Sequence, residues 1–239
     1  MSGAEERLRN DPTSELWGEH RARYRFALEH LRPGQTVLDV ACGAGFGLDM
    51  LSRAGVFATG VDYDQAPLAD RRIGATRTVV QADATCLPFN TQSFDVVVSF
   101  ETIEHVNNAG ALVAEIRRVL KPGGPLILST PNRAFRESAN PFHIREFKPD
   151  ELRELLQQHF QTVRLFGQKP SGHYRYVPFL MLNRVSTPDA LVWKAMVRLP
   201  FGMKNRLALA LTGRPFYPSE NDYCFGATDG AHALVAIAR

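Results

Sequence analysis

Cysteine is scarce in this chain of 239 residues, and its three cysteines are scattered. Cys42, Cys86 and Cys224 are odd in number and far apart, which argues against a disulfide framework and a clustered metal site. The sequence also has no uninterrupted apolar run of the roughly 18 residues that a membrane span needs. Its first residues, MSGAEERLRNDP, place no apolar run behind their basic residues, so no signal peptide is expected. We therefore expect a cytoplasmic protein with reduced thiols and no bound metal.

The composition is that of an ordinary globular protein, with 44% hydrophobic and 22% charged residues, so one principal domain is the default. The formal charge of +3 is unevenly spread. Residues 169–214 hold eight basic side chains and one acidic side chain, which leaves the rest of the chain at −4. Such a region suits an anionic substrate or a membrane surface, or is a solvated basic face. Nucleic acid is not expected, because no recognition module accompanies the charge.

From residue 36 onward, short apolar runs alternate with longer amphipathic segments. Strands are predicted in the runs TVLDVAC, VFATGVDYD, RTVVQADA, FDVVVSFE, PLILSTP, QTVRLFGQ and HALVAIAR. Helices are predicted in GLDMLSRAG, QAPLADRRIG, NAGALVAEIRRVLKPGG and KPDELRELLQQHF. This alternation implies an α/β protein whose mostly parallel sheet has helices on both faces. Ligands of such a sheet bind outside the carboxyl ends of its strands.

The loop after the first predicted strand, LDVACGAGFG, combines an acid with closely spaced glycines. Gly43 and Gly45 allow positive φ angles and a close approach of the backbone to a ligand. The spacing differs from the dinucleotide fingerprint G-x-G-x-x-G, and Asp39 would repel a pyrophosphate at the following helix N-terminus. A zwitterionic or cationic ligand suits this loop better, although a tight turn without any ligand is the alternative.

Two further acids follow the next two predicted strands. Asp62 stands nineteen residues beyond Gly43 in GVDYD, where a carboxylate can accept both hydroxyls of a ribose. Asp83 in QADAT can accept from the exocyclic amine of an adenine, with Ala84 against its face. Each acid alone is an ordinary loop residue, but acids at three successive strand ends predict a nucleoside-containing ligand.

These motifs together resemble the class I S-adenosylmethionine-dependent methyltransferases. The matching stretches are VLDVACGAGFG, GVDYD, QADATCLPF, FDVVVSFETIEHV, RVLKPGGPLILSTPNR and NPFHIREF. The resemblance covers residues 19–168 and the last strand. It implies a Rossmann-like, seven-stranded sheet of order 3-2-1-4-5-7-6 with the last strand antiparallel. It also implies S-adenosyl-L-methionine as the cofactor and S-adenosyl-L-homocysteine as its product.

The resemblance assigns cofactor-binding residues by position. Gly43 and Gly45 would approach the methionine part of the cofactor, Asp62 its ribose, Asp83 its adenine, and Phe100 its sulfonium region. A narrower likeness, to bacterial methyltransferases of sugar and surface-glycan pathways, includes the N-terminal motif EH..RY.FA at residues 19–27. By this likeness, residues 19–27 would form a helix that covers the cofactor, and Arg23 and Tyr24 would contact the cofactor's carboxylate. The full expected set is Arg23, Tyr24, Asp39, Gly43, Ala44, Gly45, Asp62, Tyr63, Asp83, Ala84 and Phe100.

Two histidines are candidates for the proton transfer that methylation of a hydroxyl requires. His105 follows the fourth strand in ETIEHV, and His143 follows the fifth strand in ANPFHIREF. A neutral imidazole is basic at cellular pH and is often oriented by a carboxylate, for which Glu104 and Glu146 are the neighbours. Either histidine is alternatively a loop anchor or cap. Side chains expected to bind the acceptor are Asn132, Arg133, Arg145, His173, Tyr174 and Tyr176.

The expected organisation has three parts. Residues 1–35 form an N-terminal helical cap, residues 36–168 and 229–239 form the cofactor-binding core, and residues 169–228 form a helical insertion over the acceptor site. The leading interpretation is methylation of a hydroxyl of a sugar or of a glycosylated or hydroxylated natural product. N-methylation of an amino sugar or small amine and O-methylation of a quinone-type precursor are alternatives. A binding protein without catalysis is a further one, and association with a membrane surface is not favoured.

Overall fold

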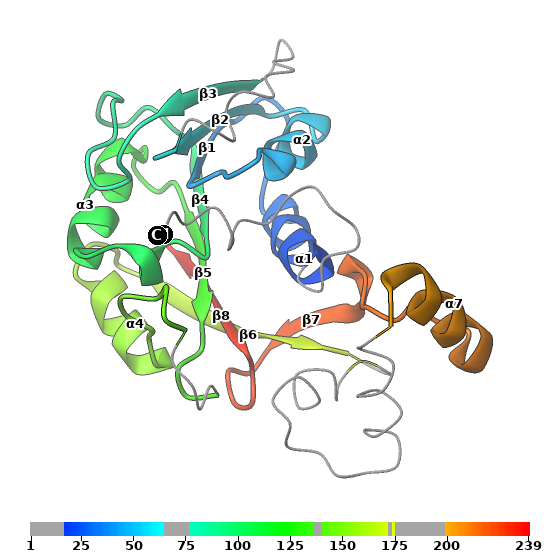
Figure 1. Cartoon of the computed structure of the whole chain (residues 1–239). Helices are drawn as coiled ribbons and strands as arrows, with labels where there is room; N and C mark the ends of the chain where they lie inside the picture. The colour runs from blue at the N-terminus through cyan, green and yellow to red at the C-terminus, as the bar shows by residue number, and fades with distance from the viewer. Residues whose placement is uncertain (1–16, 65–76, 136–139, 172–173, 175–198) are drawn as a thin grey trace.

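The computed structural model describes residues 17–64, 77–135, 140–171, 174 and 199–239. An eight-stranded sheet passes through the fold (Figure 1). Its strands are β1 (Thr36–Val40), β2 (Phe57–Asp62), β3 (Arg77–Gln81), β4 (Val96–Phe100), β5 (Leu126–Pro131), β6 (Val163–Pro170), β7 (Tyr223–Gly226) and β8 (Ala233–Ala238). The helices are α1 (Trp17–Leu28), α2 (Phe46–Arg53), α3 (Ala109–Val119), α4 (Pro149–Gln157) and α7 (Phe201–Thr212), with the short 3-10 helices η2 (Ile103–His105) and η4 (Glu220–Asp222).

The strand order is β3-β2-β1-β4-β5-β8-β6-β7. Strands β1 to β5 pair in parallel, whereas β8 is antiparallel to both β5 and β6. The predicted order is confirmed, with β8 as the predicted seventh strand. The structure adds β7, which pairs antiparallel with β6 at the edge of the sheet. Its four residues, YCFG, are too short and too irregular for a pattern of alternating polarity to reveal it.

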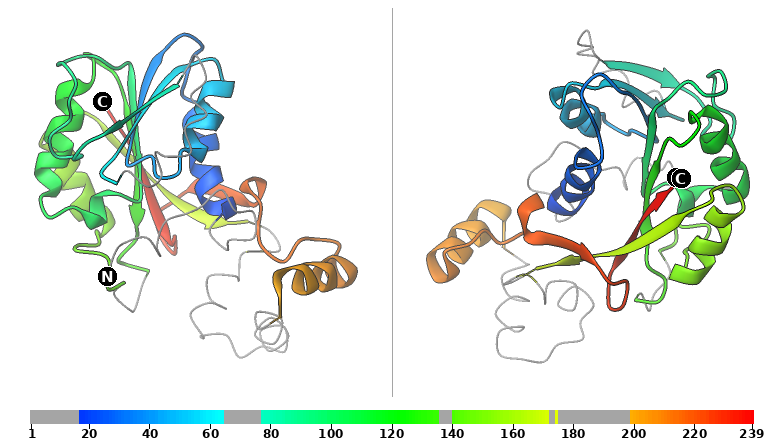
Figure 2. Two further views of the ribbon diagram at one scale, coloured as in Figure 1. Left: turned by 45° about the horizontal axis from the view of Figure 1, so that its top comes forward. Right: turned by 180° about the vertical axis from the view of Figure 1, so that it is seen from behind.

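Helices cover both faces of the sheet (Figure 2). On one face, Leu112 of α3 and Leu152 of α4 are fully buried in one hydrophobic cluster. On the other face, Ala27 of α1 and Leu51 of α2 are fully buried in a second cluster. All five residues of β4, which lies between the clusters, are buried. An apolar strand without alternation is expected there, because a parallel strand is covered on both sides.

The N-terminal helix α1 is fixed by the C-terminal part of the chain. Arg21 of α1 donates to Glu220 of η4 through two nitrogens, at 2.8 and 3.0 Å. Tyr24 of α1 packs edge-on against Phe46 of α2 and Phe100 of β4, with ring centroids 5.2 and 4.9 Å apart. These contacts place one face of α1 beside the carboxyl ends of β1 and β4.

Between β6 and β8, helix α7 supplies a helical part of the predicted insertion. Lys204 is its buried polar residue, and its Nζ donates to the hydroxyl of Tyr217 at 2.6 Å. The helix predicted in residues 65–74 lies outside the described residues, as do residues 172–173 and 175–198 of the predicted insertion. Among the residues that the structure describes, no helix combines the length and apolar character needed to cross a bilayer.

Candidate functional site

The glycine loop between β1 and α2 adopts the conformation that its sequence predicts. Gly43 has φ +53° and Gly45 has φ +78°, both in the left-handed region that glycine permits. A Cβ placed on Gly43 would meet no atom within 4 Å, so this loop faces open space. A Cβ on Gly47 would lie 2.0 Å from Cζ of Tyr24, so the close contact of that ring with α2 requires glycine. Ala44 between the first two glycines is exposed.

Asp62 ties the end of β2 to the glycine loop. Its Oδ2 accepts a hydrogen bond from the Gly43 amide at 2.8 Å, and its Oδ1 accepts from the Asp64 amide at 3.0 Å. Tyr63 beside it is 75% exposed. Asp62 thus helps to shape the loop as well as standing where the ribose of a nucleoside is expected.

Asp39 is a fully buried acid next to the glycine loop. Its Oδ2 accepts from the hydroxyl of Tyr24 at 2.9 Å, while its Oδ1 has no hydrogen-bond partner among the described residues. Burial raises the pKa of Asp39 to about 7, and the negative charge of Asp62 adds to the rise. The same burial and the Asp39 carboxylate raise the pKa of Tyr24 well above its usual value. Tyr24 therefore remains a hydrogen-bond donor to Asp39.

The third expected acid, Asp83, lies just after β3. It is exposed, and its Oδ1 accepts from the Thr85 amide and hydroxyl, both at 2.7 Å. These bonds lower the pKa of Asp83. Ala84 is half-buried against the core. Because β2 pairs in parallel with β3, Asp62 and Asp83 lie at the same edge of the sheet.

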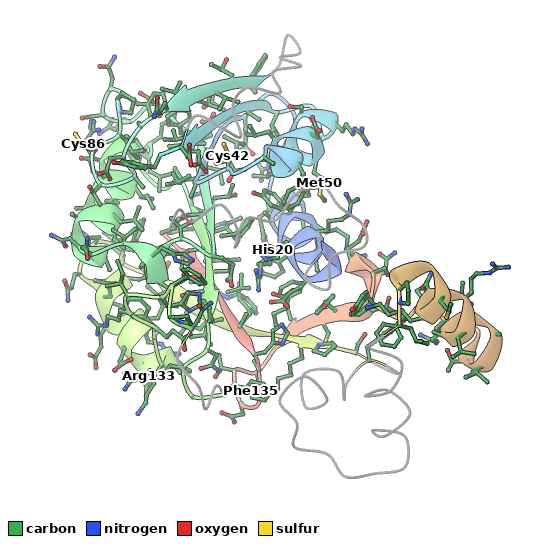
Figure 3. The ribbon with its side chains drawn as sticks, viewed as in Figure 1. His20, Cys42, Met50, Cys86, Arg133 and Phe135 are labelled. Atoms are coloured by element: carbon green, nitrogen blue, oxygen red, sulfur yellow. The ribbon has the colours of Figure 1, made fainter. Side chains whose placement is uncertain are left out.

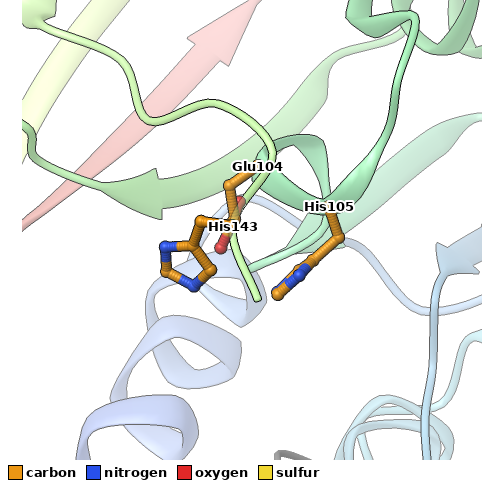
Figure 4. A group of neighbouring side chains, drawn as sticks. All are labelled: Glu104, His105 and His143. Carbon is orange, nitrogen blue, oxygen red and sulfur yellow. The ribbon is translucent and has the colours of Figure 1, made fainter. Parts of the chain in front are cut away.

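The two candidate histidines come together in space, although 38 positions separate them in the sequence. Their rings meet edge-on with centroids 4.9 Å apart (Figure 4). Nδ1 of His105 lies 3.0 Å from the Phe142 carbonyl oxygen, which can only accept. Nδ1 of His105 therefore carries the hydrogen, and its Nε2 carries a lone pair. His105 is exposed.

His143 has carboxylate and amide partners. Its Nδ1 lies 2.6 Å from Oε1 of Glu146, and its Nε2 lies 3.0 Å from Nδ2 of Asn140. Donation from Nδ1–H to the carboxylate and acceptance from the amide satisfy both ring nitrogens. The expected pairing of Glu146 with His143 is thus present as a contact.

The loop that carries His143 is held against η2 by backbone hydrogen bonds. The amides of Ile144 and Arg145 donate to the Glu104 carbonyl at 2.7 and 3.1 Å. Phe147 is fully buried and anchors the end of the loop, whereas the Phe142 side chain is 48% exposed. The contact of Phe142 with His105 is made by the Phe142 backbone carbonyl and not by its ring.

Glu104 is fully buried and faces both histidines (Figure 4). Its Oε2 accepts from the Thr130 hydroxyl at 2.9 Å, and its Oε1 has no hydrogen-bond partner among the described residues. Burial, with the neighbouring Glu101, raises the pKa of Glu104 well above its usual range. The carboxylate is held by the end of β5 and lies close to the histidines.

A buried network that the sequence did not indicate surrounds Arg23, whose exposure is 0%. Arg23 donates to Gln168 Oε1 at 2.7 Å, forms an ion pair with Glu19, and places Nη1 3.3 Å from Glu101 Oε1. Glu101 directly follows β4, has a rare positive φ of 51°, and accepts from Ser129 at 2.9 Å. The sequence signal for Glu101 is its position at the end of a predicted strand. The catalytic candidates predicted in that segment were Glu104 and His105.

Two histidines, His232 and His20, lie near this network. His232 lies 3.1 Å from Glu19, and Glu19 has a lowered pKa because it lies beside His232 and Arg23 despite its burial. His20, which belongs to α1 and is labelled in Figure 3, is half-buried, and its burial with the Arg23 charge lowers its pKa to about 4. His20 is therefore neutral at physiological pH.

The expected acceptor-binding residues are spread over the fold. Asn132 is buried, and its Nδ2 donates to the Ala231 carbonyl at 2.8 Å. Arg133, at the periphery in Figure 3, is 56% exposed and lies 3.7 Å from Glu151. The Arg145 guanidinium stacks 4.8 Å from the centre of the Phe147 ring. Tyr174 is buried and donates to the Pro215 carbonyl at 2.6 Å. The other two, His173 and Tyr176, lie outside the described residues.

Comparison with known proteins gives a match in the part of the chain that carries this site. Residues 38–128 match the family model described as "Methyltransferase domain". These residues are therefore similar to a methyltransferase domain. The matched stretch spans the glycine loop, Asp62, Asp83 and the Glu104–His105 pair. This match supports the resemblance to class I methyltransferases for this part of the chain.

Two relatives extend this comparison. The chain is 40% identical over 136 residues to a "Probable S-adenosylmethionine-dependent methyltransferase" of Mycolicibacterium smegmatis, covering 54% of this chain and 53% of the relative. It is 36% identical over 107 residues to a "Ubiquinone biosynthesis O-methyltransferase" of Hahella chejuensis, covering 42% of this chain and 45% of the relative. The chain therefore matches about half of each relative's length.

The fold also matches solved methyltransferase structures. A SAM-dependent methyltransferase from Archaeoglobus fulgidus superposes with a TM-score of 0.61 over 94% of both chains, at 18% identity. This likeness confirms the predicted Rossmann-like fold.

Proposed function

We propose that this protein transfers the methyl group of S-adenosyl-L-methionine to a hydroxyl of a sugar, or of a glycosylated or hydroxylated natural product. The methyltransferase domain and the name of the Mycolicibacterium relative support this cofactor. A solved neighbour, a phosphoethanolamine N-methyltransferase of Haemonchus contortus, contains S-adenosyl-L-methionine and superposes over 92% of this chain and 52% of the neighbour, with a TM-score of 0.59 and 19% identity. The observation that supports transfer to a hydroxyl is the contact between His105 and His143. These two histidines follow β4 and β5, at the edge of the sheet where the glycine loop follows β1.

The residues at the glycine loop fit this cofactor. Gly43 leaves open space for it, and the unpartnered, buried Oδ1 of Asp39 suits a ligand with positive charge. We assign Asp62 to the ribose, Asp83 with Ala84 to the adenine, Gly43 and Gly45 to the methionine part, and Phe100 to the sulfonium region. Arg23 is engaged by Glu19, Glu101 and Gln168, so its expected contact with the cofactor carboxylate remains a prediction.

His105 is the better candidate for the general base. Its Nε2 has no partner among the described residues, whereas Nε2 of His143 accepts from Asn140. When bound, the cofactor supplies a methyl group on a sulfonium, whose sulfur keeps the electron pair as the new oxygen–carbon bond forms. His105 Nε2 then takes the proton of the acceptor hydroxyl. His143 packs against His105 and helps to hold its ring.

The polar surroundings of this edge support a polyhydroxylated acceptor. Glu101, Ser129 and Thr130 follow or end β4 and β5, and hydrogen bonds link these strand ends. Buried polar groups that can bond hydroxyls discriminate strongly against ligands without them. We propose that residues 169–228, with Tyr174 among them, complete the acceptor site together with the cap formed by residues 1–35.

A quinone-type precursor is the second candidate acceptor. The 36% identity to a ubiquinone biosynthesis O-methyltransferase favours it, and both candidates use a hydroxyl acceptor. The decisive experiment incubates the full chain with isotopically labelled cofactor and a panel of sugars, amino sugars, catechols and hydroxylated natural products. We expect one labelled methyl group on the oxygen of a sugar-type acceptor. A labelled catechol alone, a labelled amine, or cofactor binding without any product would each contradict the proposal.

Asp62→Ala is expected to raise the cofactor Kd by about 10- to 100-fold, because it removes a charged hydrogen-bond acceptor worth roughly 1.5–3 kcal/mol. The substitution also frees the Gly43 amide, which Asp62 holds at 2.8 Å. Isothermal titration calorimetry with S-adenosyl-L-homocysteine measures this change. Asp150→Ala, at an 87% exposed carboxylate, is the matched control. A Kd for Asp62→Ala within threefold of wild type would refute the assignment.

Cofactor affinity is expected to rise with pH through about 7 because of Asp39. Its pKa is raised to about 7, so below that pH the buried carboxyl is protonated and a cationic ligand must displace the proton. Above pH 7 the carboxylate is already charged, and the affinity levels off. Calorimetry at pH 6 and pH 8 should show a roughly tenfold difference in S-adenosyl-L-methionine Kd. Asp39→Asn should abolish this difference, and an identical pH dependence in both proteins would contradict the role of Asp39.

A further inference from the structure

We propose that Glu104, His105 and His143 bind one divalent cation of the zinc class. Each offers one ligand atom, and these atoms all lie within 4.8 Å of one another (Figure 4). Two imidazole nitrogens and a carboxylate oxygen are a donor set typical of Zn²⁺ and of neighbouring transition metals, and unlike the all-oxygen sets of Mg²⁺. This inference shares its site with the proposed function, but its test measures binding independently of methyl transfer.

The imidazoles are oriented as metal ligands usually are. A ligating histidine generally donates its second ring N–H to a carboxylate or a backbone carbonyl. His105 meets the Phe142 carbonyl at 3.0 Å, and His143 meets the Glu146 carboxylate at 2.6 Å, in both cases through Nδ1. Both Nε2 atoms therefore bear lone pairs. A cation at His143 replaces the hydrogen bond from the Asn140 amide.

The third ligand is an unpartnered atom in a buried position. Glu104 is 0% exposed, and Thr130 holds its Oε2, while Oε1 has no hydrogen-bond partner among the described residues. A buried carboxylate oxygen without a partner is costly, and a cation removes that cost. The backbone of Glu104 also binds the His143 loop through the Ile144 and Arg145 amides. One residue thus ties together both elements that supply the ligands.

The geometry needs only a small contraction. Ligand atoms about 2.0–2.2 Å from a tetrahedral zinc ion lie roughly 3.4 Å apart, so a 4.8 Å separation closes with movements of about 1 Å. The exposed His105 side chain provides this freedom. Three protein ligands leave the fourth position open.

Metal binding and the general-base role exclude each other at His105. The Nε2 lone pair that binds a cation is the one that accepts the proton of the acceptor. Zinc-class cations at saturation are therefore expected to suppress turnover, and a chelator is expected to restore it.

The test is direct titration of the chelator-treated full chain. Calorimetry with ZnCl₂ and visible absorption with CoCl₂ should each report one equivalent bound, whereas MgCl₂ should not bind. His105→Ala and His143→Ala should each weaken this binding by at least tenfold. His159→Ala, after the end of α4, removes a histidine from outside the cluster and should leave it unchanged.

Two controls keep the outcomes distinct. Calorimetry with S-adenosyl-L-homocysteine shows that each variant is folded. Absence of a zinc equivalent, or affinity unaffected by His105→Ala and His143→Ala, would overturn the metal site while leaving the proposed methyl transfer intact. Zinc binding as expected, combined with turnover that requires zinc, would uphold the site and overturn His105 as the base.

Discussion

Replacing His105 with alanine is expected to lower kcat by about 10²- to 10⁴-fold, the range that a positioned general base contributes. The imidazole Nε2 is free to take a proton, and the Phe142 carbonyl fixes the ring's tautomer at 3.0 Å. The cofactor Kd should remain within threefold of wild type, because Asp62 and the glycine loop belong to other elements. Turnover with saturating cofactor and the acceptor found in the panel is the measurement.

The neighbouring histidine provides the comparison for this result. His143→Ala should reduce kcat less, because its Nε2 is bonded to Asn140 and it acts on the His105 ring by packing. Glu146→Gln should lower kcat about as much as His143→Ala does, because Glu146 Oε1 lies 2.6 Å from Nδ1 of the His143 ring. If both histidine variants retain near wild-type turnover with cofactor binding intact, neither histidine is the base.

Arg23→Met is expected to lower the free energy of unfolding by about 3–5 kcal/mol, the range for removing one partner of a buried ion pair. Arg23 has 0% exposure, and its loss leaves Glu19, Glu101 and Gln168 without their shared donor. For a chain of 239 residues this corresponds to a Tm lower by roughly 6–20 °C. Thermal denaturation followed by circular dichroism measures the change.

A surface arginine is the control for this substitution. Arg153 is 41% exposed and pairs with the exposed Asp150 at 3.1 Å, so Arg153→Met should change stability by no more than about 0.5 kcal/mol. If Arg23→Met and Arg153→Met changed the free energy of unfolding equally, the buried network would contribute no more stability than a surface ion pair. Arg23→Lys should be intermediate, because lysine keeps the charge but not the planar fork of donors.

The strands themselves were predictable because local patterns indicate them, whereas their order was predicted from the resemblance to class I methyltransferases. The apolar run at β4 indicates a parallel strand covered on both faces, and β4 is buried throughout. The glycines after β1 indicate a loop with positive φ, and Gly43 and Gly45 have it. By contrast, β7 was not predicted. It is a strand because it pairs with β6, and its own four residues show no strand pattern.

The fold brings several predicted site residues to one edge of the sheet, and what they bind stays a prediction. Strand ends place Asp39, Asp62 and Asp83 at one edge, as expected for a parallel sheet. Asn132 was expected to face an acceptor, but its amide bonds the Ala231 carbonyl instead. Arg133 was also expected to bind the acceptor, and it lies 3.7 Å from Glu151 of α4.

The sequence by itself determined the alternation of strands and helices, the glycine loop and the residues at the strand ends, because these follow from local periodicity. The order of the strands followed from the resemblance to class I methyltransferases. Only the tertiary structure decided that the loop 140–147 closes on Glu104, so that His105 and His143 meet, and that Arg23 is buried among acids from distant segments. The physical reason is that hydrogen bonds and ion pairs between remote segments depend on how the elements pack. Sequence spacing does not encode that packing.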